Sequence, residues 1–245
     1  MPELILSDIT IMGQGFCVIG LEQLSPDSFR SVRPMPPWGF AWREPFPYRR
    51  GDSAAFEPVP TVASRPHVED QKSRGLAKTS RSLSEPELVE CLQKAEMSPD
   101  LENLFHCPVQ AGTKGGGAVW VNPAEARRSI CGCAYSNLRF RLFPEAEGFN
   151  LRAEIVLGSN ERVSSIPVVD REWRWFAHQL IQRIRRSDPL PLAERFLNRT
   201  ICNKLLATPH RLARIGLPRP RGDQQCWLML DSLFPQPLES WLDLL

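Results

Sequence analysis

The sequence predicts a mainly β protein of the α+β class, built from two small antiparallel β-barrels with helical inserts. Residues 138–170 contain three runs of alternating polar and apolar side chains, separated by short polar turns, and this pattern predicts an antiparallel meander. Residues 3–11 and 16–21 are apolar runs on either side of two glycines, which predicts a hairpin. Helical spacing of apolar residues is clearest in residues 171–186. Predicted strands therefore outnumber predicted helices.

The length and composition are those of a globular protein with room for two small domains. The chain has 245 residues, of which 42% are hydrophobic and 24% are charged, and its net charge is +2. We expect a first barrel domain over residues 1–70, a linker with short helices over 71–115, and a second barrel domain over 116–245 with a helical insert at 171–199. No apolar run approaches the ~20 residues that span a bilayer, and the first residues lack the basic start of a signal peptide. We therefore expect a cytoplasmic protein with no membrane partner.

In the first half, turn residues and apolar runs define the elements. A short strand is predicted at residues 29–33 and ends at a proline. Residues 35–48 are predicted to be irregular because their prolines lack the backbone N–H groups that strand pairing needs. Residues 53–62 are typical of a further strand, whereas residues 64–83 are polar and predict a linker or extended arm. Ser84 then caps a helix. Its apolar stripe consists of Leu88, Cys91, Leu92 and Ala95.

In the second half, a glycine loop at residues 112–117 precedes strands at 118–121 and 129–135, which lead into the meander. The helix at residues 171–186 has an apolar face that should pack on this sheet. Its buried positions are expected to be Trp173, Phe176, Leu180 and Ile184. A second short helix begins at Leu190. The remaining segments are predicted as strand or extended structure at residues 203–207, 211–215 and 226–230.

The cysteines and the glycine loop do not form a known metal-binding or phosphate-binding pattern. Cys131 and Cys133 are separated by one residue, whereas zinc sites usually pair C-x2–4-C with a second such pair. The seven cysteines are odd in number and scattered, so we expect no disulfide framework in the cytoplasm. Lys114 precedes the glycines of its loop, which excludes a P-loop. No metal and no cofactor are therefore expected.

His67, Glu69 and Asp70 are the other residues with catalytic side chains in close sequence proximity. They could belong to a metal-dependent nuclease site, but no second carboxylate cluster accompanies them, so structural or capping roles are favoured. We expect no catalytic residues. An enzyme with a metal at the cysteines or at His67 remains an alternative class.

Several short motifs occur in a family-like order along nearly the whole chain. They are Val32-Arg33-Pro34, Arg50-Gly51-Asp52, Pro66-His67-Val68-Glu69-Asp70, Leu104-Phe105, Ile166-Pro167-Val168-Val169-Asp170 with Trp173, Arg214-Ile215-Gly216-Leu217-Pro218-Arg219-Pro220, and Cys226-Trp227-Leu228. In this order they resemble the dual OB-fold family of bacterial conflict and defence systems. The resemblance implies two OB-like barrels and nucleic-acid binding, and the family has no agreed catalytic residues.

The loop after the third strand interleaves arginines with aromatic residues. An OB-fold that binds single strands needs basic residues for the backbone and aromatic platforms for the bases. The expected nucleic-acid-binding residues are Arg33, Trp38, Trp42, Arg43, Tyr48, Arg49 and Arg50. The alternative interpretation is a proline-rich flap that packs on its own barrel, with solvated arginines.

These observations together predict a non-enzymatic protein that binds nucleic acid, expected to be single-stranded, within a bacterial defence or nucleic-acid-processing system. The alternative is an adaptor subunit that holds a partner nuclease or helicase. The net charge of +2 favours the adaptor, because counterion-driven binding depends on clustered positive charge.

Overall fold

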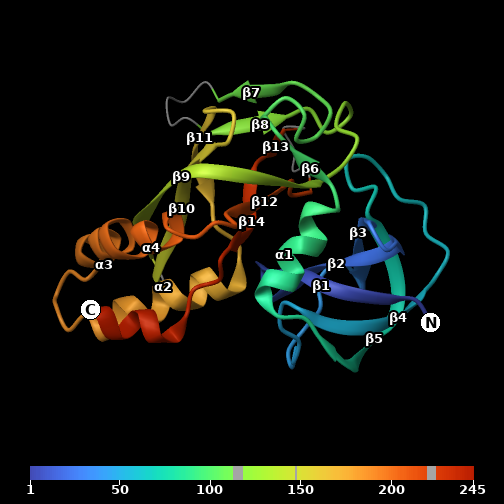
Figure 1. Cartoon of the computed structure of the whole chain (residues 1–245), viewed down its shortest axis with the longest axis horizontal. Helices are drawn as coiled ribbons and strands as arrows, with labels where there is room; N and C mark the ends of the chain where they lie inside the picture. The colour runs from blue at the N-terminus through green and yellow to red at the C-terminus, as the bar shows by residue number, and fades with distance from the viewer. Residues whose placement is uncertain (113–117, 147, 220–224) are drawn as a thin grey trace.

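The computed structural model describes residues 1–112, 118–146, 148–219 and 225–245. The protein is mainly β, as expected. Figure 1 shows a barrel built from the N-terminal strands, beside a larger sheet from the second half of the chain that carries helices on its outer side. No helix among the described residues has the length and apolar character needed to cross a membrane.

The first five strands form a closed barrel. They are β1 (Glu3–Met12), β2 (Gly15–Ser25), β3 (Ser28–Met35), β4 (Asp52–Pro58) and β5 (Asp70–Ser82). Their order is β1-β2-β3-β5-β4, with β4 paired to β1 and with β3 and β5 parallel, which is consistent with the expected OB-like barrel. The predicted β1–β2 hairpin is confirmed, and Gly13 adopts a φ of +60° at its turn.

Strand β5 occupies most of the segment that was expected to be a linker or extended arm, so that expectation over residues 64–83 is wrong. Most of its side chains face solvent, and Leu76 and Ala77 are its two apolar residues. Its pairing with β3 and β4 uses backbone groups, which a polar sequence supplies as well as an apolar one.

Helix α1 (Glu85–Gln93) joins the barrel to the larger sheet. Ser84 and Glu87 form the capping box at its start. Leu88 and Leu92 are buried between barrel residues and strands of the second half. The helix is followed by the short strand β6 (Met97–Ser98), which pairs with the larger sheet. The two bodies therefore share one hydrophobic cluster.

The larger sheet has the order β11-β10-β9-β12-β14. Its strands are β9 (Ile130–Glu145), β10 (Gly148–Leu157), β11 (Arg162–Pro167), β12 (Leu212–Gly216) and β14 (Met229–Phe234). The predicted antiparallel meander is confirmed by the pairing of β9, β10 and β11. The ends of the sheet meet at an isolated parallel bridge between Val168 and Leu230, and a second closed barrel is not shown among the described residues.

A small sheet covers one end of the molecule. It contains β7 (Val109–Ala111), β8 (Val119–Val121) and β13 (Cys226–Trp227). The single strand expected at residues 226–230 is therefore divided, because β13 pairs with β8 while β14 pairs with β12. The glycine loop falls largely outside the described residues, at 113–117, as do residues 220–224 between β12 and β13.

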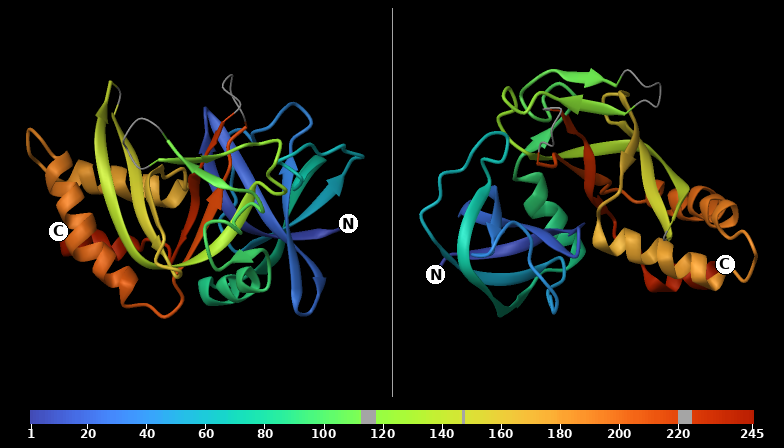
Figure 2. Two further views of the ribbon diagram at one scale, coloured as in Figure 1. Left: turned by 90° about the horizontal axis from the view of Figure 1, so that it is seen from above. Right: turned by 180° about the vertical axis from the view of Figure 1, so that it is seen from behind.

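The helices pack on the outer side of the larger sheet (Figure 2). They are α2 (Arg171–Arg183), α3 (Leu190–Phe196), a π-helical turn (Leu197–Ile201), α4 (Cys202–Leu206) and a final 3-10 helix (Glu239–Leu244). The predicted face of α2 is confirmed: Trp173, Phe176 and Leu180 are buried, and Ile184 packs at its end. The extended segment expected at residues 203–207 is wrong, because Leu197, Ile201 and Leu205 continue the helical spacing of α3 into the core.

Candidate binding site

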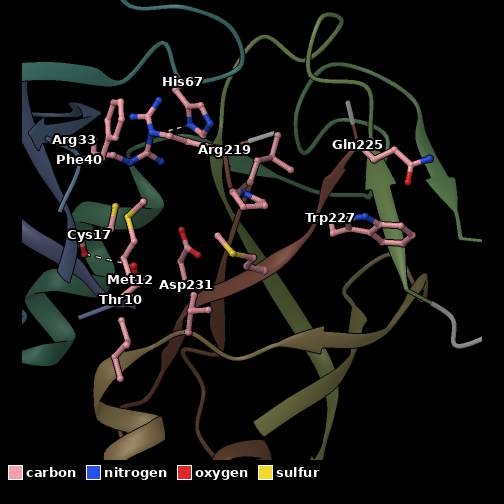
Figure 3. Close-up of a pocket in the computed structure, with 16 residues that line it drawn as sticks. Thr10, Met12, Cys17, Arg33, Phe40, His67, Arg219, Gln225, Trp227 and Asp231 are labelled. Atoms are coloured by element: carbon pink, nitrogen blue, oxygen red, sulfur yellow. Dashed lines mark hydrogen bonds between the residues drawn. The ribbon is translucent and has the colours of Figure 1, made fainter. Parts of the chain in front are cut away.

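A cavity of about 470 Å³ lies between the first barrel and the larger sheet. On the barrel side it is lined by the end of β1 and the β1–β2 turn, by Cys17 of β2, by Arg33 of β3 and by His67 of the β4–β5 loop. On the opposite side it is lined by β14 and by the segment that follows β12. Figure 3 shows these side chains converging from both bodies. The site therefore depends on both halves of the chain.

Arg33 organises the polar wall of this cavity on the barrel side. Its Nη1 donates to Asp70 Oδ1 at 2.8 Å and lies 2.9 Å from His67 Nδ1, and its Nη2 donates to Ser129 Oγ at 2.9 Å. A guanidinium can only donate, so His67 accepts through Nδ1 and holds its proton on Nε2. Burial and the positive charge of Arg33 lower the pKa of His67 to about 3. This imidazole is therefore neutral near pH 7.

Glu69 and Asp70 connect the two bodies. The Glu69 carboxylate accepts from the backbone N–H of Ser129 at 2.9 Å and from its hydroxyl at 2.7 Å. Asp70 accepts from Arg33 and from Arg219 of the segment after β12. Both carboxylates are thus engaged in contacts across the interface.

An arginine and an aromatic ring form one edge of the cavity. The Arg219 guanidinium lies 3.9 Å from the ring centroid of Phe40, a cation–π contact between the two bodies. Phe40 is 52% exposed, with Arg219 over one face of its ring. A second depression of about 470 Å³ shares Met12 and Phe40 with the cavity and is also lined by Trp38 and Arg43. The two depressions therefore adjoin each other at Met12 and Phe40.

Asp231 of β14 points into the cavity from the opposite wall (Figure 3). It is only 4% exposed, and its Oδ1 has no hydrogen-bond partner among the described residues. Burial and the nearby Asp8 carboxylate raise the pKa of Asp231 to about 8, although Arg33 and Arg214 oppose this effect. Its carboxyl group is therefore largely protonated near pH 7.

Four of the seven expected binding residues are buried. These are Arg33, Trp42, Tyr48 and Arg50. Trp42 Nε1 donates to the Pro34 carbonyl at 2.7 Å, and the Tyr48 hydroxyl donates to the Leu76 carbonyl at 2.7 Å. Both rings belong to the core cluster of the first barrel. For Trp42 and Tyr48, the structure matches the alternative of a flap packed on its own barrel.

Arg50 lies at the interface of the two bodies instead of on the surface. Its Nη1 donates to Asp170 Oδ2 at 3.0 Å, and its guanidinium lies 5.1 Å from the Phe234 ring centroid. The three expected residues that remain exposed are Trp38, Arg43 and Arg49. The sequence does not show which of the seven residues are buried and which are exposed, because an irregular loop has no periodicity that assigns side chains to a face.

Sequence reasoning missed Asp231 and assigned Arg219 only to a motif. A signal for Asp231 was present, since an aspartate stands within a strand that is apolar apart from Asp231 and Ser232, and charged residues are almost never fully buried without a partner. Cys131 and Cys133 are both fully buried, and burial raises the pKa of Cys131 to about 11. Within the described ranges, no group of three or more His, Cys, Asp or Glu side chains is placed to hold a metal ion.

Comparisons of the chain with protein-family models, with curated proteins and with solved structures gave no match.

Proposed function

We propose that this protein binds single-stranded nucleic acid through the concave surface of its first barrel, as a non-enzymatic component of a bacterial defence or nucleic-acid-processing system. The observation that carries this proposal is the position of the cavity. On its barrel side the cavity is lined by β2, β3, the β1–β2 turn and the β4–β5 loop, and its other side is formed by the second half of the chain. An OB-fold binds oligonucleotides with this same combination of strands and loops. The link to defence systems rests on the resemblance of the sequence motifs alone.

The exposed rings at the mouth of the cavity supply the stacking platforms that single-strand binding requires. Trp38 is 59% exposed and Phe40 is 52% exposed. Trp38 contacts the buried Trp42 edge to face, with ring centroids 5.9 Å apart, so its orientation is supported by the barrel core. Every base has an aromatic face that can stack on such rings, whatever the sequence.

Exposed arginines beside these rings supply contacts for the phosphates. Arg43 lines the same depression as Trp38, and Arg49 is exposed near the end of the loop. Neither makes an ion pair among the described residues. Their charges are thus available to a nucleic-acid backbone, which is the main source of affinity in such complexes.

We also propose that the larger sheet is a second, partly open OB-like barrel. Its first three strands form a meander, and helices precede the last two, whose order repeats that of the first barrel. The parallel bridge between Val168 and Leu230 corresponds to the parallel β3–β5 pairing of the first barrel. OB-folds are partly open barrels, so a single closing bridge is compatible with this assignment.

Fluorescence anisotropy with single-stranded and duplex probes tests the proposed function. Trp38→Ala should weaken single-strand binding by about 1–3 kcal/mol and leave the melting temperature unchanged. Trp42→Ala should instead destabilise the fold by about 3–5 kcal/mol, because its ring is buried. Trp175→Ala, which removes an exposed tryptophan of α2, is the matched control and should change neither property. Equal binding by wild type and the folded Trp38→Ala variant would contradict the proposal.

An adaptor for a partner nuclease or helicase is the second candidate function. It is favoured by a groove of about 400 Å³ near the ends of α2 and α3, whose floor includes Ile184, Leu192 and Phe196. Four arginines line the same groove: Arg185, Arg186, Arg195 and Arg199. An acidic, apolar segment of a partner would fit this combination. A folded protein that binds no nucleic acid at low salt would favour this second function.

A further inference from the structure

We propose that the groove at the ends of α2 and α3 binds an acidic amphipathic helix of a protein partner. The inference rests on the adaptor function, to which it gives a binding mode, and it does not require nucleic-acid binding by the first barrel. Three observations support it: a cluster of exposed arginines, an apolar floor between them, and an acidic segment of this chain that packs beside the groove.

The positive charge of the chain is concentrated in the helices of its second half. Residues 171–206 contain eight Lys or Arg and three Asp or Glu, a net charge of +5, whereas the whole chain carries +2. Two of the three acids are already paired: Glu172 with Arg171, and Glu194 with a residue of β9. Figure 1 shows these helices at the end of the molecule that lies away from the first barrel. A negatively charged partner is therefore attracted to this end of the protein.

Four arginines from both bordering elements line the groove, which has a volume of about 400 Å³. They are Arg185 and Arg186 after α2, Arg195 of α3, and Arg199 of the π-helical turn. All four are exposed, and none of them forms an ion pair within the described ranges. Like charges that lie close together repel one another, so carboxylates bound between them would lower the energy.

The floor of the groove between these arginines is apolar. It consists of Ile184, Leu192, Phe196 and Leu245. Ile184 and Phe196 also pack against the core of the second half, which fixes their positions, whereas Leu192 is 38% exposed. An apolar floor with cations beside it matches a helix that has an apolar stripe and acidic flanks. Such a helix binds by laying its apolar face into the groove.

The final 3-10 helix shows which kind of segment packs on α2. This segment, Glu239–Leu244, buries Leu242, and its Asp243 pairs with Arg183 of α2 at 2.8 Å. It thus combines the burial of a leucine with a contact between an arginine and a carboxylate. The adjacent Leu245 lines the groove. A partner segment of the same chemistry would extend these contacts along the groove.

Two other occupants match the groove less closely. Single-stranded nucleic acid stacks its bases on aromatic rings, whereas the exposed floor residues Leu192 and Leu245 are aliphatic. Amphipathic helices that bind anionic membranes insert an apolar face into the lipid. Ile184 and Phe196 are instead half-buried within a groove. An acidic helix satisfies both the arginines and the floor.

The test uses the full chain and a fluorescently labelled peptide of about sixteen residues, roughly four helical turns. Its leucines recur at i, i+3, i+4 and i+7, and the other positions are glutamate, glutamine and alanine. One control peptide has the same composition with its leucines spread around the helix, and a second has lysine in place of each glutamate. Anisotropy titrations should show that the amphipathic acidic peptide binds at least about fivefold more tightly than the first control. Its affinity should fall as salt is added, and the lysine peptide should not bind.

Two variants show whether the peptide binds in the groove. Arg195→Glu reverses one charge and should weaken binding of the acidic peptide at least about tenfold. Leu192→Gln keeps every charge and should weaken it about fivefold, because the apolar contact is lost. Arg65→Glu, at an exposed position of the β4–β5 loop, is the matched control and should change the affinity less than about twofold, because salt screens distant charges. Leu192 and Arg195 are both exposed, so the melting temperature of each variant should equal that of wild type.

Three results would overturn the inference: no binding of the acidic peptide at low salt, equal binding of both leucine arrangements, or binding that Arg195→Glu leaves unchanged. Vesicles of anionic and neutral phospholipid and a single DNA strand are titrated in parallel. If either of them binds in an Arg195-dependent manner and the peptide does not, the groove belongs to a membrane or to nucleic acid, and the inference is wrong.

The inference and the proposed nucleic-acid binding fail separately. Trp38→Ala should leave peptide binding unchanged, and Arg195→Glu should leave strand binding within about twofold of wild type. A protein that binds strands and not the acidic peptide would contradict only the inference. A protein that binds the peptide and no strand would contradict only the nucleic-acid function.

Discussion

Asp170 and Asp231 are both buried at the interface of the two bodies, but their surroundings differ. Asp170 accepts hydrogen bonds from the backbone N–H groups of Glu172, Trp173 and Leu233 and from the Arg50 guanidinium. Asp231 has an oxygen without any such partner in the described part of the chain. Burial alone therefore does not show whether a carboxylate is fully hydrogen-bonded. The contacts of each of its oxygens show this.

The role of Asp170 follows from the elements that it connects. It caps α2, it binds β14 through Leu233, and it neutralises an arginine from the loop of the first barrel. A single side chain thus fixes the barrel, the helix and the sheet relative to one another. Asp231 makes no comparable connection through its Oδ1, which is buried without a hydrogen-bond partner among the described residues.

The largest expected effect is the loss of stability in Asp170→Ala. This change removes the helix cap and the buried counter-charge of Arg50, which keeps only a longer contact of 3.5 Å to the part-exposed Glu172, so the free energy of unfolding should fall by about 3–5 kcal/mol. Urea unfolding monitored by tryptophan fluorescence measures it. Asp27→Ala, which removes an exposed ion pair with Lys94, is the control and should cost less than about 1 kcal/mol. Equal effects of the two changes would remove the distinction between Asp170 and an ordinary surface carboxylate.

The next effect concerns the pH dependence of stability. Burial raises the folded-state pKa of Asp231 to about 8, above its value in the unfolded chain, so the folded state binds this proton more tightly. The resulting stabilisation is complete below pH ~4 and is lost as the pH rises toward 8. Asp231→Asn has no proton to lose. As the pH rises, wild type should lose about 1.4 kcal/mol of unfolding free energy per pH unit that the variant does not lose. The variant should therefore become more stable relative to wild type by about 2.8 kcal/mol between pH 5 and 7.

Urea unfolding of both proteins at pH 5, 6 and 7 provides this measurement. The difference between the two proteins isolates Asp231, because Asp170 titrates in both. If the difference in unfolding free energy between the two proteins stayed constant with pH, Asp231 would be ionised throughout this range, as an ordinary paired carboxylate is.

The sequence predicted those elements whose burial imposes a period on the side chains. The meander and α2 each bury one face, and a regular pattern is the consequence. Strand β1 is instead buried at every position from Leu4 to Thr10, and the β1–β2 hairpin was predicted from its apolar runs and its glycine turn. Strand β5 was not predicted because it contributes few buried side chains and pairs through its backbone. Helix α4 was not predicted because its apolar residues continue the helical spacing of α3, and the prediction divided this stretch into a short helix and an extended segment.

The site was harder to predict than the fold because it is formed by contacts between distant segments. Trp38 and Trp42 lie four residues apart in a proline-rich loop, and only the packed barrel shows that one is exposed and the other buried. Arg33 and Asp231 are nearly two hundred positions apart in the sequence and line one cavity. Local patterns carry no information on such a pairing, since it depends on how the two bodies dock.

The smallest expected effect is a change in the salt dependence of binding when an exposed arginine of the loop is removed. Arg43 and Arg49 are exposed, whereas Arg50 is held by Asp170. Removing one arginine that neutralises a phosphate of a single strand should lower the slope of log affinity against log salt by about 0.7. Arg43→Ala and Arg49→Ala should each flatten the slope by that amount without changing the melting temperature. Arg49→Lys keeps the charge and should keep the slope. If neither alanine variant flattens the slope, these arginines do not bind phosphates, and the interface must lie elsewhere on the protein.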